Sequence, residues 1–220
     1  MKIRFGWLFA VLPLISLAMT LSVRAQTTFS NTGTITINDN AVATPYPSNI
    51  LVSGLGTSLT NVTLTLTGIT HTFPDDIDML LVGPQGQTAV IFSDVGGSIA
   101  ASGVTITLDD SAALPLLDTG PLVSGTFQPT NIGTADTFPP PAPASFSTAS
   151  ALSIFTGTNP NGTWNLFVVD DLGGDSGSIA GGWSLTITAA IPEPSTWMLL
   201  SLGLVGMVAL TYVRRRKYAA

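Results

Sequence analysis

The sequence contains no cysteine and a single histidine, His71, in 220 residues. Without cysteine there can be no disulfide and no thiolate metal site, and one histidine cannot build a zinc site from several imidazoles. Lysine and arginine are absent between Ala25 and Val213, although the chain has seven in all. Because binding to phosphates requires a basic surface, this absence excludes nucleic acid as a partner.

The same interval is rich in acid. It holds twelve aspartates and one glutamate, Glu193, so the body of the chain is far more acidic than the formal net charge of −6 suggests. A domain of this kind repels itself unless cations screen or bind its carboxylates.

The first 25 residues are typical of a secretory signal peptide. Lys2 and Arg4 precede an apolar run at Phe5–Val23, and small residues surround a cleavage point after Ala25. The pattern predicts export, with signal peptidase as a processing enzyme. An uncleaved N-terminal membrane anchor is the alternative.

From Phe29 to Thr188 the sequence favours β-structure throughout. Apolar residues alternate with threonine or serine, and this period of two is typical of half-buried antiparallel strands. The alternating stretches are Ile35–Ile37, Val62–Thr67, Val104–Leu108 and Trp183–Thr188. Turn-forming residues separate them, and no stretch shows a convincing helical period of 3.6.

Two stretches, Ile77–Val82 and Trp164–Val169, are apolar on both faces, which indicates central strands with Trp164 as a core anchor. About eight or nine strands in ~160 residues favour an all-β sandwich of two sheets of the jelly-roll type. The irregular segment Asp118–Phe146, with prolines at its centre, is interpreted as a surface excursion. A polyproline ligand is the alternative.

The predicted regions are a signal peptide (1–25), a β-domain (26–189) and a C-terminal region (190–220). The last contains, in order, Pro192-Glu193-Pro194, an uncharged stretch at Trp197–Val213, and the basic residues Arg214, Arg215, Arg216 and Lys217. As a helix, the uncharged stretch would be ~26 Å long and is predicted to cross a membrane once. The basic end would stay in the cytoplasm and the acidic domain would lie outside.

This arrangement resembles the PEP-CTERM sorting signal of Gram-negative bacteria. The resemblance implies that an exosortase recognises the region and cleaves near the Pro-Glu-Pro motif. The protein would then be released or passed to the cell envelope or the extracellular polymer matrix. The implied sorting residues are Pro192, Glu193, Pro194, Arg214, Arg215 and Arg216.

The body resembles the P domain (Homo B domain) of subtilisin-like proprotein convertases over about Ile37–Ile187. The similarity is carried by His71–Asp78, Leu81–Gly86, Asn161–Leu166 and Gly177–Leu185. It implies a jelly-roll β-sandwich. In the convertases this module accompanies a catalytic domain and is needed for its folding and stability. The sequence shows no such catalytic domain, so protease activity does not transfer to this chain.

The aspartates fall mostly beside predicted strand ends, where loops gather. Because calcium takes six to eight oxygens from carboxylates and loop carbonyls, we expect one or two structural Ca²⁺ ions there. Asp76 and Asp78 are two residues apart, which on a strand places both carboxylates on one face. The expected ligands are Asp75, Asp76, Asp78, Asp170, Asp171 and Asp175, with Asp94, Asp109 and Asp110 as secondary candidates. The alternative is that these residues form turns and solvated surface charge.

His71 is interpreted as a structural hydrogen-bond partner, with a catalytic base as the alternative; glycoside hydrolysis by paired carboxylates is another. The sequence offers no catalytic triad and no cofactor loop. It therefore predicts a non-catalytic exported module in adhesion or matrix assembly, with calcium as stabiliser and exopolysaccharide as a candidate ligand. The alternative function, implied by the P-domain resemblance, is an accessory module that stabilises or recruits a separately encoded, secreted subtilisin-like protease.

Overall fold

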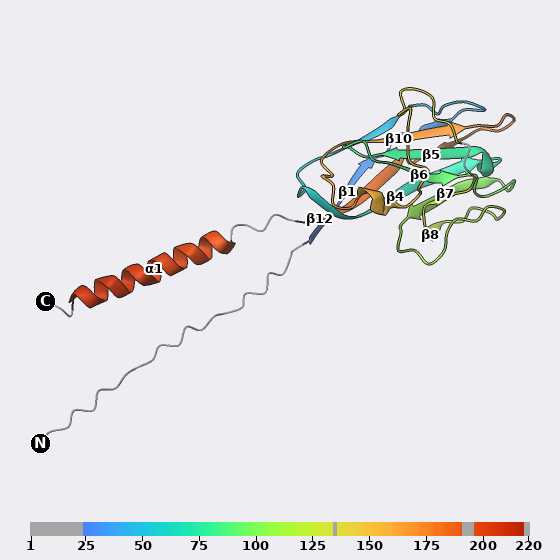
Figure 1. The fold of residues 1–220 in the computed structure, drawn as a ribbon. Coiled ribbons are helices and arrows are strands. Elements are labelled where there is room, and N and C mark those ends of the chain that lie inside the picture. Colours follow the sequence, from blue (N-terminus) through green and yellow to red (C-terminus); the bar gives the residue numbers. More distant parts are fainter. Residues whose placement is uncertain (1–23, 134–135, 191–195, 218–220) are drawn as a thin grey trace, which may run out of the picture.

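The computed structural model describes residues 24–133, 136–190 and 196–217. Twelve strands in the described residues form two sheets, and a single α-helix follows them in sequence (Figure 1). Residues 1–23 of the predicted signal peptide and the Pro-Glu-Pro motif lie outside the described residues. The predicted all-β body is confirmed.

The larger sheet is built around one long strand, β4, which pairs along one edge with β11 and β12 and along the other with β7. β1, β2 and β8 extend the sheet beyond these neighbours. The strands of this sheet are β1 (Arg24–Asn31), β2 (Ile35–Ile37), β4 (Ser58–His71), β7 (Ala101–Leu108), β8 (Gly125–Phe127), β11 (Gly177–Ile179) and β12 (Trp183–Ala190).

The smaller sheet has the order β3-β10-β5-β6-β9. Its strands are β3 (Ser48–Val52), β5 (Ile77–Val82), β6 (Thr88–Ser93), β9 (Thr130–Asn131) and β10 (Gly162–Asp170), and two 3₁₀ turns, η1 (Pro74–Asp76) and η2 (Leu152–Phe155), interrupt the body. The predicted central strands, β5 and β10, lie side by side in the middle of this sheet. More strands form than the predicted eight or nine, partly because β8, β9 and β11 are too short to show a period in the sequence.

The core lies between the two sheets. Alternate residues of β4, β7 and β12 point into it, and they meet the inward residues of β5 and β10 in one buried cluster. Trp164 is fully buried there, its Nε1 donates a hydrogen bond to the carbonyl oxygen of Pro160 at 2.9 Å, and its ring packs against Phe155. The predicted two-sheet packing and the core role of Trp164 are confirmed, while the jelly-roll connectivity stays a prediction.

The second face of the smaller sheet is also covered, which explains why β5 has no polar face. Outward residues of β5, β6 and β10 form a second apolar cluster with Phe138 and Ala142 of the proline-rich segment. Tyr46 packs edge-on against Phe167 at 5.0 Å and donates a hydrogen bond to the Pro139 carbonyl oxygen at 3.0 Å. Part of the segment predicted as a surface excursion, the part with Phe138 and Ala142, is therefore a packed cover over this face. β8 and β9 of the same segment join the larger and the smaller sheet, respectively.

The C-terminal helix α1 (Thr196–Lys217) contains the stretch predicted to be helical. In the part of the chain that the structure describes, no helix combines the length and apolarity needed to cross a membrane, so the predicted single span at 197–213 is not confirmed. β1 and β12 pair along their whole lengths, with Arg24 opposite Ala190. Both ends of the described sandwich therefore lie at the same place (Figure 1).

Candidate metal centre at one end of the sandwich

Carboxylates gather at one end of the smaller sheet. η1 leads into the first residue of β5, Ile77, which pairs with Asp170, the last residue of β10. The neighbouring strand β6 runs antiparallel to β5, with Met79 opposite Phe92, so Asp94 also falls at this end. The antiparallel register thus brings together aspartates that are far apart in the sequence.

Three of these carboxylates form a compact group, which we call the aspartate triad: Asp78, Asp94 and Asp136. One oxygen of each lies within 4.8 Å of those of the other two. The Ser93 hydroxyl lies between two of them, 3.1 Å from Oδ2 of Asp94 and 3.0 Å from Oδ1 of Asp136. Carboxylates in such an arrangement can ligate a hard cation through oxygen.

The triad is short of hydrogen-bond donors. Oδ1 of Asp78 and Oδ2 of Asp136 are buried and have no hydrogen-bond partner among the described residues. Burial, followed by repulsion from Asp136, raises the pKa of Asp78 to about 8, although the Ser93 hydroxyl partly offsets the effect. Burial also raises the pKa values of Asp94 and Asp136, again against the opposing effect of Ser93. The unpartnered oxygens and the raised pKa values both indicate that negative charge is poorly solvated at this site.

Asp76 and Asp78 do not share a strand face as the sequence suggested. Asp76 ends the 3₁₀ turn η1, so it is not on the strand that begins at Ile77. Burial and then the charge of Asp170 raise the pKa of Asp76 to about 6. Asp78 instead experiences Asp136 as its strongest charged neighbour. The turn therefore separates the two residues into different carboxylate groups.

Asp170 is occupied by protein partners. Its Oδ2 accepts a hydrogen bond from Nε2 of His71 at 3.1 Å, and its Oδ1 lies 3.2 Å and 3.3 Å from the backbone N–H groups of Asn40 and Leu172. Nδ1 of His71 lies 2.9 Å from the carbonyl oxygen of Phe73. Since the side chains of His71 and Asp170 are both fully buried, this contact links the end of β4 in the larger sheet to the end of β10 in the smaller sheet.

The other predicted ligands have separate surroundings. Asp171 is exposed, and Asp175 accepts a hydrogen bond from the Thr72 hydroxyl at 2.5 Å. Oδ1 of Asp75 is buried and has no hydrogen-bond partner among the described residues, and burial raises the pKa of this carboxyl. Asp109 accepts two hydrogen bonds from Ser111 at 2.8 Å and stabilises a turn.

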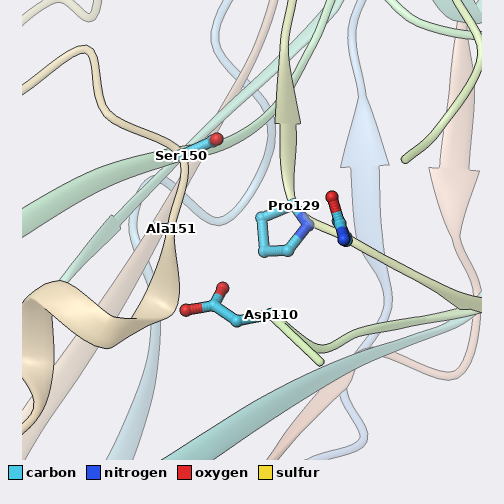
Figure 2. A pocket seen from close by; sticks show the side chains of 5 residues that line it. Asp110, Pro129, Ser150 and Ala151 are labelled. Atoms are coloured by element: carbon cyan, nitrogen blue, oxygen red, sulfur yellow. The ribbon is translucent and has the colours of Figure 1, made fainter. Parts of the chain in front are cut away.

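Asp110 lies outside this end of the sandwich, beside a hollow of about 220 Å³ (Figure 2). Gln128, Pro129, Ser150 and Ala151 complete its lining. Both oxygens of Asp110 accept backbone hydrogen bonds at the start of η2, from Leu152 at 2.8 Å and Ser153 at 2.7 Å. The carboxylate therefore anchors a turn, which is the role that the alternative interpretation of the acidic residues gave it.

Asp136 is not among the ligands that the sequence predicts. It lies in the irregular, proline-rich segment, with no strand end beside it, and Ser93 and Asp136 are 43 residues apart. Only packing of the segment across the smaller sheet brings it to the triad. The one signal available in the sequence was its charge, in a body with no basic residue.

Comparison with known proteins identifies the C-terminal region. Residues 190–217 match the family model of the PEP-CTERM protein-sorting motif. No curated protein matches the chain.

Among solved structures, the chain is similar to the Aeromonas sobria serine protease in complex with the chaperone, at 14% identity, a TM-score of 0.40 and 79% coverage of this chain. It is also similar to the Aeromonas sobria serine protease alone, at 12% identity, a TM-score of 0.35 and 80% coverage. This chain spans 28% of the length of each. Likeness at this level says nothing of activity. The chain thus consists of a two-sheet β-body followed by a PEP-CTERM sorting motif, a signal that implies export and sorting to the cell envelope.

Proposed function

We propose that this protein is an exported, non-catalytic β-sandwich module that an exosortase sorts to the cell envelope or the extracellular polymer matrix. There it serves in adhesion or matrix assembly, with exopolysaccharide as a candidate ligand. The match of residues 190–217 to the PEP-CTERM motif carries the proposal. A stabilising role for Ca²⁺ and the jelly-roll connectivity of a P domain belong to the same proposal.

The boundaries of the sandwich support this processing. β12 ends at Ala190, before Pro192 of the sorting motif, so cleavage near that motif leaves every strand intact. Cleavage after Ala25 removes only the first two residues of β1, which pair with the end of β12. Cleavage at either predicted site would therefore leave the residues of both buried apolar clusters in the mature protein.

The test is replacement of Pro192, Glu193 and Pro194 by alanine in the host, with Ser195→Ala as the matched control. The triple variant should accumulate in cells with its C-terminal region attached, while the control should reach the envelope and medium like the wild type. Fractionation and immunoblotting measure both. Normal export and processing of the triple variant would refute sorting through this motif.

The P-domain resemblance supports a second candidate, an accessory module for a separately encoded, secreted subtilisin-like protease. Two residues of the stretches that carry this resemblance have structural roles in the β-body: His71 contacts Asp170, and Trp164 is buried in the core. Under this alternative, the mature protein used as bait should retain a subtilase from culture medium. Retention of polysaccharide without a subtilase would favour the first proposal.

A further inference from the structure

We propose that the aspartate triad, Asp78, Asp94 and Asp136, binds one Ca²⁺ ion that fastens the proline-rich segment to the edge of the smaller sheet. The three carboxylates come from β5, from the residue after β6, and from the segment between β9 and η2. One oxygen of each lies within 4.8 Å of the others. The inference concerns the folded body and does not depend on sorting by an exosortase.

The burial of Asp78 is the observation that points to a ligand. Asp78 is 1% exposed, and its Oδ1 has no hydrogen-bond partner among the described residues. Oδ2 of Asp136 is also buried and without a hydrogen-bond partner among the described residues. A buried carboxylate without a donor or a counter-ion is costly, so such groups are ordinarily paired or bound to a metal.

Among the described residues, no basic side chain forms an ion pair with the triad. Lysine and arginine are absent between Ala25 and Val213, and the only histidine, His71, contacts Asp170 instead. The Ser93 hydroxyl has one hydrogen to share among the three carboxylates, which is too few to satisfy them. A bound cation would satisfy all three carboxylates at once.

The donor set selects the class of ion. All the donors are oxygens, whereas zinc sites are typically built with histidine or cysteine. Ca²⁺ accepts six to eight oxygens in irregular geometry, while Mg²⁺ demands a near-ideal octahedron. Three carboxylates from three separate segments meet the first requirement more readily than the second. Asp94 and Asp136 are only partly buried, which leaves room for water as additional ligands.

The ion would link the core to the cover of the smaller sheet. Asp78 is on the central strand β5, whereas Asp136 is two residues before Phe138, which packs on the outer face of the sheet. Phe138 also packs edge-on against Phe146 at 5.2 Å. A cation held by both carboxylates therefore stabilises the proline-rich segment in its packed position.

The other acidic residues are poorer candidates for this ion. Both oxygens of Asp170 accept hydrogen bonds from protein groups, and so do both oxygens of Asp110. Asp75 also has an unpartnered buried oxygen, but among the described residues only the triad brings three carboxylates within 4.8 Å of one another, two of them with such an oxygen.

The test uses the mature protein purified from its host and stripped of metal with EDTA. Titration with CaCl₂ in a calorimeter should show one ion bound per chain. At about 100 times the dissociation constant, Ca²⁺ should raise the melting temperature by roughly 5–10 °C. It should also slow proteolysis of the proline-rich segment. The same concentration of MgCl₂ should give a much smaller shift.

Variants locate the site. Asp94→Asn and Asp136→Asn should each weaken Ca²⁺ binding about tenfold or more, because affinity depends on the number of charged ligands. Asp118→Asn, which removes an exposed carboxylate outside the triad, is the matched control and should bind like the wild type. Asp78→Asn should lose the Ca²⁺-induced shift, yet in EDTA it should melt at or above the wild-type temperature, because a neutral amide replaces a buried carboxyl whose ionised form is unfavourable there.

Three results would overturn the proposal. The first is a wild-type protein that shows neither bound Ca²⁺ nor a shift in melting temperature. The second is Asp136→Asn retaining the full shift, or Asp118→Asn losing it as completely as the triad variants. The third is an equal shift with Mg²⁺, which would refute the choice of ion.

Discussion

The pair of His71 and Asp170 allows a quantitative test of how the end of the sandwich is held. Nε2 of the histidine lies 3.1 Å from Oδ2 of the aspartate, and both side chains are fully buried. His71→Phe keeps a ring of similar size and removes the polar contact. It leaves the carboxylate of Asp170 buried without this partner.

Removing one partner from a buried pair costs about 3–5 kcal/mol, because an uncompensated charge remains. Asp170 keeps its contacts with the backbone N–H groups of Asn40 and Leu172, so we expect about 3 kcal/mol, the lower end of that range. Asp170→Asn can still accept from those groups and should cost about 1–2 kcal/mol.

The assay is urea unfolding of the mature protein and of the double variant His71→Phe/Asp170→Asn. In a double-mutant cycle, contacting residues couple by about 0.5–3 kcal/mol, and this pair should lie in the upper half of that range. If His71→Phe cost less than about 1 kcal/mol, within the range of exposed pairs, the structural role assigned to the histidine would be refuted.

Three further outcomes are expected. Trp164→Ala should lower the free energy of unfolding by about 3–5 kcal/mol, measured with urea, because it empties a fully buried site in the core. Phe138→Ala should cost about 2–4 kcal/mol and increase binding of a hydrophobic dye, since it uncovers the outer face of the smaller sheet. Without metal, the free energy of unfolding should fall as the pH rises from about 4 to about 8. The pKa values of Asp76 (about 6) and Asp78 (about 8) lie above those of aspartate in the unfolded chain, so in this range the folded state holds protons that the unfolded state releases. Urea titrations at several pH values test the sign of this change.

The strands of the body could be predicted because the alternation of apolar and polar residues in the sequence matches the alternation of burial along the strands. β12 alternates between buried and half-buried residues along its whole length, and all six residues of β5 are buried. An apolar run such as Ile77–Val82 requires cover on both faces. The sequence could not identify the cover on the second face, because Phe138 and Ala142 lie in a segment without periodicity.

The candidate site was predicted only in part for the same reason. Asp78 and Asp94 are next to strand ends, where local sequence points to loops with carboxylates. Asp136 reaches them through packing between distant segments, which no local pattern records. The prediction that Asp76 and Asp78 share a strand face was wrong because the 3₁₀ turn that begins at Pro74 includes Asp76, and the strand begins only at the next residue, Ile77.

Export of the chain and its sorting by an exosortase are the basis of the proposed function. Its most direct test is the intact mass of the protein from each cell fraction, in host strains with and without exosortase. We expect a species that begins near Gln26 and ends near Pro192–Pro194, present in the envelope or medium and lost when exosortase is removed. A full-length, membrane-retained species in both strains would contradict it.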